Sequence, residues 1–136
     1  MSSASQPLST TERNKQLVLR WFREVWNEGR RETVSELFLD DAVLHDGGHT
    51  MRGPKEFLVF YDNLRAQFTD FRISPVVDLA EGDHVCLHWV ATFRHKESGR
   101  PMHITGTSVV RVADGRMVEA WQNWDAAGLQ AQLSAQ

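Results

Sequence analysis

The pattern of apolar and polar positions changes near the middle of the chain. In the first half, apolar residues recur every three or four positions, which is the spacing of one face of a helix. From about residue 71 they alternate with polar residues, as in strands that bury one face. Helices followed by strands is the order expected of an α+β domain, with the helices gathered on one face of a bent sheet.

The first helix has a clear start and a clear stop. Ser9-x-x-Glu12 is a capping box, in which each side chain satisfies a backbone N–H of the first turn. A wide apolar stripe runs from Leu17 to Trp26, and Gly29 follows it. These signals predict one amphipathic helix that ends at Gly29.

Two further helices are expected before the strands. A short one should cover residues 32–38 and be followed by a short strand at 42–44 and a loop at Gly47-Gly48. Another should begin at Gly53-Pro54, because proline suits the first turn of a helix, and its apolar positions extend to Phe68.

The second half predicts an antiparallel meander of four strands. Turn signals at 81–83, 98–99 and 114–115 separate the apolar runs. The second run alternates most clearly, so its odd-numbered residues should share one face and its even-numbered residues the other. Asp125 then reads as the N-cap of a short C-terminal helix. The expected strands cover residues 71–80, 84–93, 102–112 and 116–124.

Composition and charge narrow the class of protein. The chain has 136 residues, 41% of them hydrophobic, and a net charge of −3, which suits one globular domain. No basic stripe indicates nucleic-acid binding, and no apolar run is long enough to span a membrane. Cys86 is the one cysteine, so no internal disulfide is possible. We expect a disordered lead-in at residues 1–9, one domain at 10–136 and a cytoplasmic protein.

The outward face of the strands suggests a second copy as partner. The residues expected there form a face that is too apolar to lie comfortably in water, which predicts a homodimer. The four residues that carry this expectation are Cys86, Val90, Val109 and Trp121.

Four segments, taken in order, resemble the SnoaL-like polyketide cyclases and the ketosteroid isomerase-like (nuclear transport factor 2-like) superfamily. They are Trp26-Asn27-Glu28-Gly29, residues 38–46, Arg52-Gly53-Pro54, and residues 110–121 with Asp125 beyond them. The resemblance covers nearly the whole chain. It implies a cone-shaped, curved antiparallel sheet packed on N-terminal helices around one pocket that is open at one end. It does not settle the chemistry, because one fold hosts many activities.

The resemblance also implies which side chains reach the pocket. Five would bind a small hydrophobic substrate, and either His45 or Asp46 would reach in from the short strand, since neighbouring strand residues face opposite sides. The five expected substrate-binding residues are Phe22, Trp89, Ser108, Gln122 and Trp124.

The catalytic pattern of these relatives transfers only in part. Cyclases of this family use a carboxylate where this chain has Gln122, and an amide does not exchange protons near neutral pH. Ketosteroid isomerases resemble the chain at Asp46, the position of their general base. The acid pair of their oxyanion hole is replaced here by Phe22 and Ser108. His45 and Asp46 therefore remain as candidate acid/base residues.

Two functions from different classes follow. The first is a cofactor-independent acid/base enzyme, of isomerase, dehydratase or cyclase type, acting on a polyketide- or terpenoid-like molecule. The second is a binding or carrier protein without chemistry, since Gln122 holds an oxygen but cannot cycle protons. No cofactor is expected because no glycine-rich phosphate-binding motif is present. No metal is expected either, because His84, Cys86 and His88 lie along one flat strand face.

Overall fold

The computed structural model describes residues 7–135. The expected disordered lead-in, residues 1–9, therefore lies largely outside the described residues, and Pro7–Ser9 have no regular secondary structure. The helices are α1 (Thr10–Trp21), its continuation η1 (Phe22–Asn27), α2 (Glu32–Leu37), α3 (Gly53–Gln67) and α4 (Ala126–Ser134). The strands are β1 (Phe38–Asp46), β2 (His49–Arg52), β3 (Phe68–Glu81), β4 (His84–His95), β5 (Pro101–Ala113) and β6 (Arg116–Trp124).

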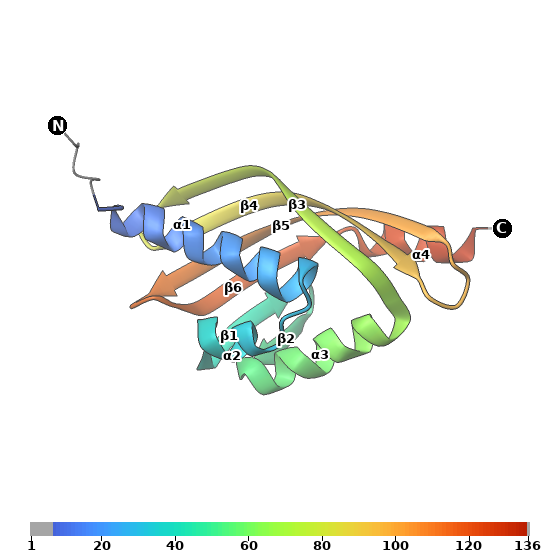
Figure 1. Cartoon of the computed structure of the whole chain (residues 1–136), viewed down its shortest axis with the longest axis horizontal. Helices are drawn as coiled ribbons and strands as arrows, with labels where there is room; N and C mark the ends of the chain where they lie inside the picture. Colours follow the sequence, from blue (N-terminus) through green and yellow to red (C-terminus); the bar gives the residue numbers. More distant parts are fainter. Residues whose placement is uncertain (1–6, 136) are drawn as a thin grey trace.

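The strands form one curved sheet in the order β2-β1-β6-β5-β4-β3. It bends around α1 and α3, which lie on its concave side (Figure 1). The α+β class and the meander of β3 to β6 are confirmed. Alternation along β4 is also confirmed, since Val85, Leu87 and Trp89 are buried while His84 and His88 are exposed. The concave face of the sheet therefore forms one wall of the core.

The expectation of an entirely antiparallel sheet is wrong at one junction. β1 pairs with β6 in parallel and with β2 in antiparallel, so the sheet is mixed. The short strand expected at 42–44 is in fact nine residues long, and Gly47-Gly48 is only the turn of the β1–β2 hairpin. The start of β1 is hard to recognise in the sequence because two adjacent polar residues, Asp40 and Asp41, interrupt the apolar pattern of the strand. Both are exposed, and they lie where the β1–β6 register shifts.

The first helix continues from α1 into a π-helical segment, η1, before it stops. Gly29 adopts φ +69°, which confirms the expected end of the helix. The wider turn leaves carbonyl oxygens to be satisfied by side chains of α3. Tyr61 Oη donates to the carbonyl of Val25 at 2.8 Å, and Arg65 donates to that of Trp26 at 3.1 Å. These contacts fix the segment that carries Phe22 and Trp26.

The last helix has the cap that its sequence indicates. The Asp125 side chain accepts a hydrogen bond from the backbone N–H of Gly128 at 2.9 Å, as an N-cap should. Gln132 and Arg100 then bind α4 to the start of β5 through backbone oxygens and the His103 N–H. Leu129 is thereby held against the core. None of the helices within residues 7–135 is long and apolar enough to cross a membrane.

Candidate functional site

A narrow apolar cavity lies between η1, α3, α4 and the concave face of the sheet. Its volume is about 60 Å³, and it is partly open to solvent. This is smaller than the roughly 150 Å³ cavity that holds a benzene in an engineered apolar core. A ligand with one ring therefore needs some wall residues to move. The cavity is lined by Phe22, Trp26, Phe60, Leu64, Phe68, Phe71, Ile73, Trp89, Ala91, Phe93, Ile104, Gln122, Trp124 and Leu129.

Two neighbouring cross-strand rows on the concave face build the polar part of the site. Asp46, Gln122 and Ser108 pair in register across β1, β6 and β5. In the next row, Trp124 pairs with Gly106, which in turn pairs with Trp89 on β4. Diagonal neighbours on one sheet face are within reach of aromatic side chains. The two tryptophans can therefore contact the polar row beside them.

Each tryptophan donates its indole N–H to that polar row. Trp124 Nε1 donates to Asp46 Oδ1 at 3.0 Å, and Trp89 Nε1 donates to Ser108 Oγ at 3.0 Å. Gly106 lies between the two indoles in the register. A Cβ built on this glycine would lie 2.8 Å from Cε2 of Trp89 and closer to two other ring atoms. The missing side chain is what lets the Trp89 ring cover the β5 backbone.

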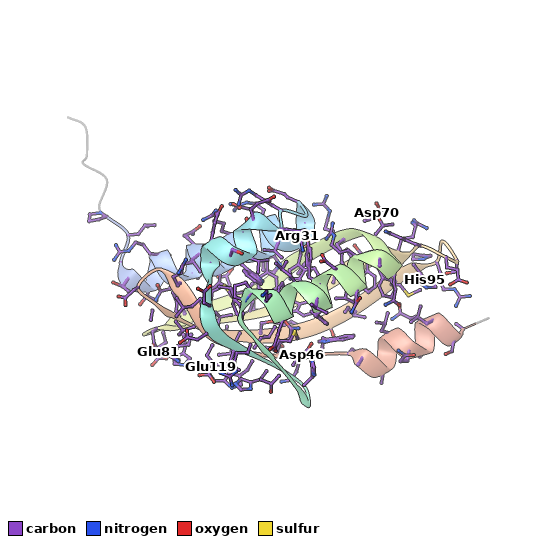
Figure 2. The ribbon with its side chains drawn as sticks, turned by 90° about the horizontal axis from the view of Figure 1, so that it is seen from below. Arg31, Asp46, Asp70, Glu81, His95 and Glu119 are labelled. Atoms are coloured by element: carbon purple, nitrogen blue, oxygen red, sulfur yellow. The ribbon has the colours of Figure 1, made fainter. Side chains whose placement is uncertain are left out.

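Asp46 is the titratable residue at this site. It lies at the end of β1 (Figure 2) and is partly buried. Burial raises the pKa of its carboxyl above the usual value, while hydrogen bonds from Trp124 and Gln122, and the charge of His49, oppose that rise. A partly desolvated carboxylate is a stronger base than one in water. Asp46 therefore has the chemistry of a proton acceptor beside an apolar cavity.

His45 lies on the other side of the sheet. Its Nε2 contacts Glu119 Oε2 at 2.9 Å, and its ring stacks on Trp121 with a centroid distance of 5.7 Å. His84 stacks on the same indole at 6.3 Å, and Arg111 contacts Glu119 at 3.4 Å. Of the two expected acid/base residues, the structure therefore places Asp46 on the cavity side and His45 on the convex face.

The other sequence-predicted site residues lie at or next to the cavity. Phe22, Trp89, Gln122 and Trp124 line it. Ser108, which is 3% exposed, lies one step deeper. There it lines a smaller void of about 20 Å³ that shares Phe22, Trp26 and Gln122 with the main cavity. Its hydroxyl oxygen is occupied by Trp89, a contact that the sequence did not reveal.

Sequence reasoning missed two residues that shape the cavity. Trp26 belongs to the apolar stripe of the first helix and was not among the expected substrate-binding residues, yet it lines both the main cavity and the smaller void. Its spacing of four residues from Phe22 places both on one helix face and was the available signal. Gly106 carried no signal, because its role depends on the ring opposite it in β4.

Metal-binding side chains do not gather anywhere in the described part of the chain. Over residues 7–135, no three or more His, Cys, Asp or Glu side chains are arranged to hold an ion. The His84, Cys86 and His88 set runs along the convex face of β4, away from the cavity. The polar side chains next to the cavity are the carboxylate, the amide and the hydroxyl of one cross-strand row.

A curved sheet wrapped around helices, with an apolar cavity and an acidic residue at its edge, defines a small ligand-binding α+β domain. Comparison with known families makes this specific. The SnoaL-like domain model matches residues 18–120, so the chain belongs to the SnoaL-like family, and the resemblance seen in the sequence is confirmed. A search of curated proteins found no significant relative.

Solved structures agree with this assignment. The chain is similar to IdmH, a proposed polyketide cyclase from Streptomyces antibioticus, with 27% identity, a TM-score of 0.81, and coverage of 90% of this chain and 99% of IdmH. A proposed SnoaL-like polyketide cyclase from Jannaschia is 21% identical, with a TM-score of 0.86 and coverage of 97% and 99%. An epoxide hydrolase of M. tuberculosis is 18% identical, with a TM-score of 0.77 and 92% coverage of both chains.

Proposed function

We propose that this protein is a cofactor-independent acid/base enzyme that acts on a small, largely apolar substrate, with Asp46 as its proton-transferring group. The observation that carries the proposal is the place of Asp46. Its carboxylate accepts a hydrogen bond from the indole of Trp124, which lines the aromatic cavity, and its pKa is raised by burial. Perturbed carboxylates at apolar clefts are typical of acid/base sites.

The reaction class follows from what these groups do to a carbonyl compound. Asp46 takes a proton from the carbon next to the carbonyl, and the same group returns it to another carbon or to oxygen. Gln122 donates an amide N–H to the oxygen that gains charge. Trp124 orients the carboxylate through its indole N–H. The aromatic walls hold the carbon skeleton. Removal of a proton from the carbon next to a carbonyl is a first step that isomerase, dehydratase and cyclase reactions on carbonyl compounds can share.

Proton exchange on a model ketone tests the proposal without knowledge of the natural substrate. We expect the protein to speed the exchange of the α-protons of 2-tetralone in D₂O, followed by NMR, relative to acetate buffer at the same pH. A positioned base contributes on the order of 10²–10⁴-fold. Asp46→Asn should remove this acceleration. His45→Gln, which alters the neighbouring residue on the convex face, should retain it.

The rate should also depend on pH in one direction. Asp46 acts as a base only when ionised, so exchange should rise with pH and level off above its pKa. Because burial raises that pKa, the midpoint should lie above that of an ordinary aspartate. Exchange that persists in Asp46→Asn would contradict the assignment of the base.

A binding protein without chemistry is the second candidate. It is favoured by Gln122, an amide at the position where cyclases of this family carry their carboxylate. Asp46 Oδ1 is also already engaged by Trp124 at 3.0 Å. Tight binding of 2-tetralone with no exchange above buffer would support this function over the enzymatic one.

We further propose that the convex face pairs with a second copy. One cross-strand row on it runs through Leu79, Cys86, Val109, Trp121 and His45. Leu79 is 62% exposed, and such a row favours burial. Light scattering should give the mass of a dimer at micromolar concentration. Val109→Asp should give a monomer. Val59→Asp, the same change at an exposed position of α3, should not. A monomeric wild type would overturn the proposed pairing of convex faces.

A cytoplasmic location stays a prediction from the sequence.

A further inference from the structure

The groups that donate hydrogen bonds to the Asp46 carboxylate are neutral. Its contacts are the indole N–H of Trp124 and the amide of Gln122, which are both neutral donors. Within residues 7–135, no Lys or Arg side chain lies within 4 Å of it. Among the described residues, the charge of His49, opposite Asp46 in the β1–β2 ladder, is what lowers the pKa of Asp46 electrostatically. The cavity edge therefore carries negative charge that is only partly compensated.

The walls beside this carboxylate are unusually suited to positive charge. Most lining residues are aromatic, and no Lys, Arg or His is among them. The face of an aromatic ring carries a negative quadrupole and attracts cations within about 6 Å. The ring of Phe71, one of the wall residues, already faces a cation, since the guanidinium of Arg65 lies 5.1 Å from its centroid. Carboxylate and ring faces act in the same direction.

We propose that the cavity binds an apolar organic cation, a tertiary or quaternary ammonium with an aryl or alkyl group, in preference to a neutral molecule of the same shape. This inference shares the site of the proposed function and rests on its placement of Asp46, but it does not depend on proton transfer.

The type of cation follows from the cost of removing it from water. A primary ammonium is strongly hydrated and would need several hydrogen-bond acceptors, whereas the cavity offers few polar atoms. A quaternary ammonium spreads its charge over methyl groups and makes no hydrogen bonds. It therefore loses less hydration on entry while it keeps its attraction to the rings and to Asp46.

A pair of probes that differ only in charge tests the preference. 3-(Trimethylammonio)phenol and 3-tert-butylphenol have the same shape, with a nitrogen in place of one carbon. Isothermal titration at pH 7 should give a dissociation constant about tenfold lower for the cation. Equal affinities, or tighter binding of the neutral probe, would overturn the proposal, as would failure of both probes to bind.

Variants separate a local effect of Asp46 from the general negative charge of the chain. Asp46→Asn keeps an oxygen that accepts from Trp124, so the fold of the site should remain. It should weaken the cation about tenfold and leave the neutral probe unchanged. Asp41→Asn removes the same charge from an exposed position of β1 and should change neither. Equal loss of cation binding in both variants would overturn the role of Asp46.

The outcome is independent of the enzymatic assay. The ketone used for proton exchange is neutral, so exchange that requires Asp46 together with no preference for the cation would overturn only this inference. A cation preference that requires Asp46, with no exchange, would support it and remove the enzymatic proposal.

Discussion

A methyl group added at Gly106 should displace Trp89 from the cavity wall. The new Cβ would lie 2.5 Å from Cη2 and 2.8 Å from Cε2 of the indole, whereas carbon atoms in contact are about 3.5–4.0 Å apart. The ring must therefore move by about 1 Å. Backbone atoms of β5 lie on one side, so the ring moves toward the cavity and away from Ser108.

Two costs follow from that movement. Overpacking of a close-packed interior costs typically about 1–3 kcal/mol. Loss of the 3.0 Å hydrogen bond from Trp89 Nε1 to Ser108 Oγ adds about 1 kcal/mol. Gly106→Ala should therefore lower the free energy of unfolding by about 2–4 kcal/mol. It should also narrow the cavity and weaken the binding of any ring-shaped probe.

Urea unfolding followed by tryptophan fluorescence measures the loss, and Gly48→Ala is the matched control. Gly48 has nothing within 4 Å of the position of a Cβ and no positive φ, so the same change there should cost little. In a Trp89→Leu background the clash is absent, so Gly106→Ala should become nearly neutral. A Gly106→Ala variant as stable as the wild type, or one whose cost is unchanged in the Trp89→Leu background, would contradict a clash between the new Cβ and Trp89.

Two further predictions concern buried or paired carboxylates. Glu24 accepts from Arg20 at 2.8 Å and from Thr33 at 2.7 Å, and these bonds lower its pKa from 4.5 to about 2. Glu24→Gln should cost about 1.5 kcal/mol at pH 7. The lowered pKa means that ionised Glu24 stabilises the fold above pH 4.5, and that this stabilisation is lost as pH falls toward 2. The difference in free energy of unfolding between wild type and Glu24→Gln should therefore shrink at pH 2–3, measured by urea unfolding. A difference that stays constant with pH would contradict this role of Glu24. Burial raises the pKa of Asp46 in the folded protein, so the neutral carboxyl favours the fold, and this stabilisation is lost as the group ionises with rising pH. Asp46→Asn should therefore raise Tm at pH 7 and leave it unchanged at pH 3, measured by circular dichroism.

The fold could be predicted because its main signals are local. Ser9 Oγ accepts a hydrogen bond from the backbone N–H of Glu12 at 3.1 Å, as the capping box predicts, and Asp125 caps α4 as expected. Alternation in β4 fixed which side chains are buried, since successive strand residues face opposite sides. Each of these signals depends on residues only a few positions apart.

The parts that could not be predicted depend on residues far apart in the chain. The parallel β1–β6 pairing leaves no local pattern and decides that Asp46 lies beside Gln122 and His45 beside Trp121. The sequence established that only one of this neighbouring pair can face the cavity. Which one does so depends on the register with β6, some 76 residues away. The acceptor role of Ser108 likewise depends on an indole in a different strand.

The cross-strand register explains why substitution at the family's catalytic positions need not leave an inert site. By the resemblance noted in the sequence, Ser108 stands where ketosteroid isomerases have an acid, but its oxygen accepts from Trp89 and so supports the cavity wall. Asp46 and Gln122, its neighbours in the same row, remain beside the cavity. Under the proposed function, that division leaves Asp46 as the base and Gln122 as one weak neutral donor. Such a pair suits substrates in which the C–H next to the carbonyl is already fairly acidic. The reason is that a neutral amide donor stabilises an enolate less than a carboxylic acid donor does. Compounds with two carbonyl groups flanking one carbon, which ionise more readily than simple ketones, should therefore be turned over faster than simple ketones of equal size.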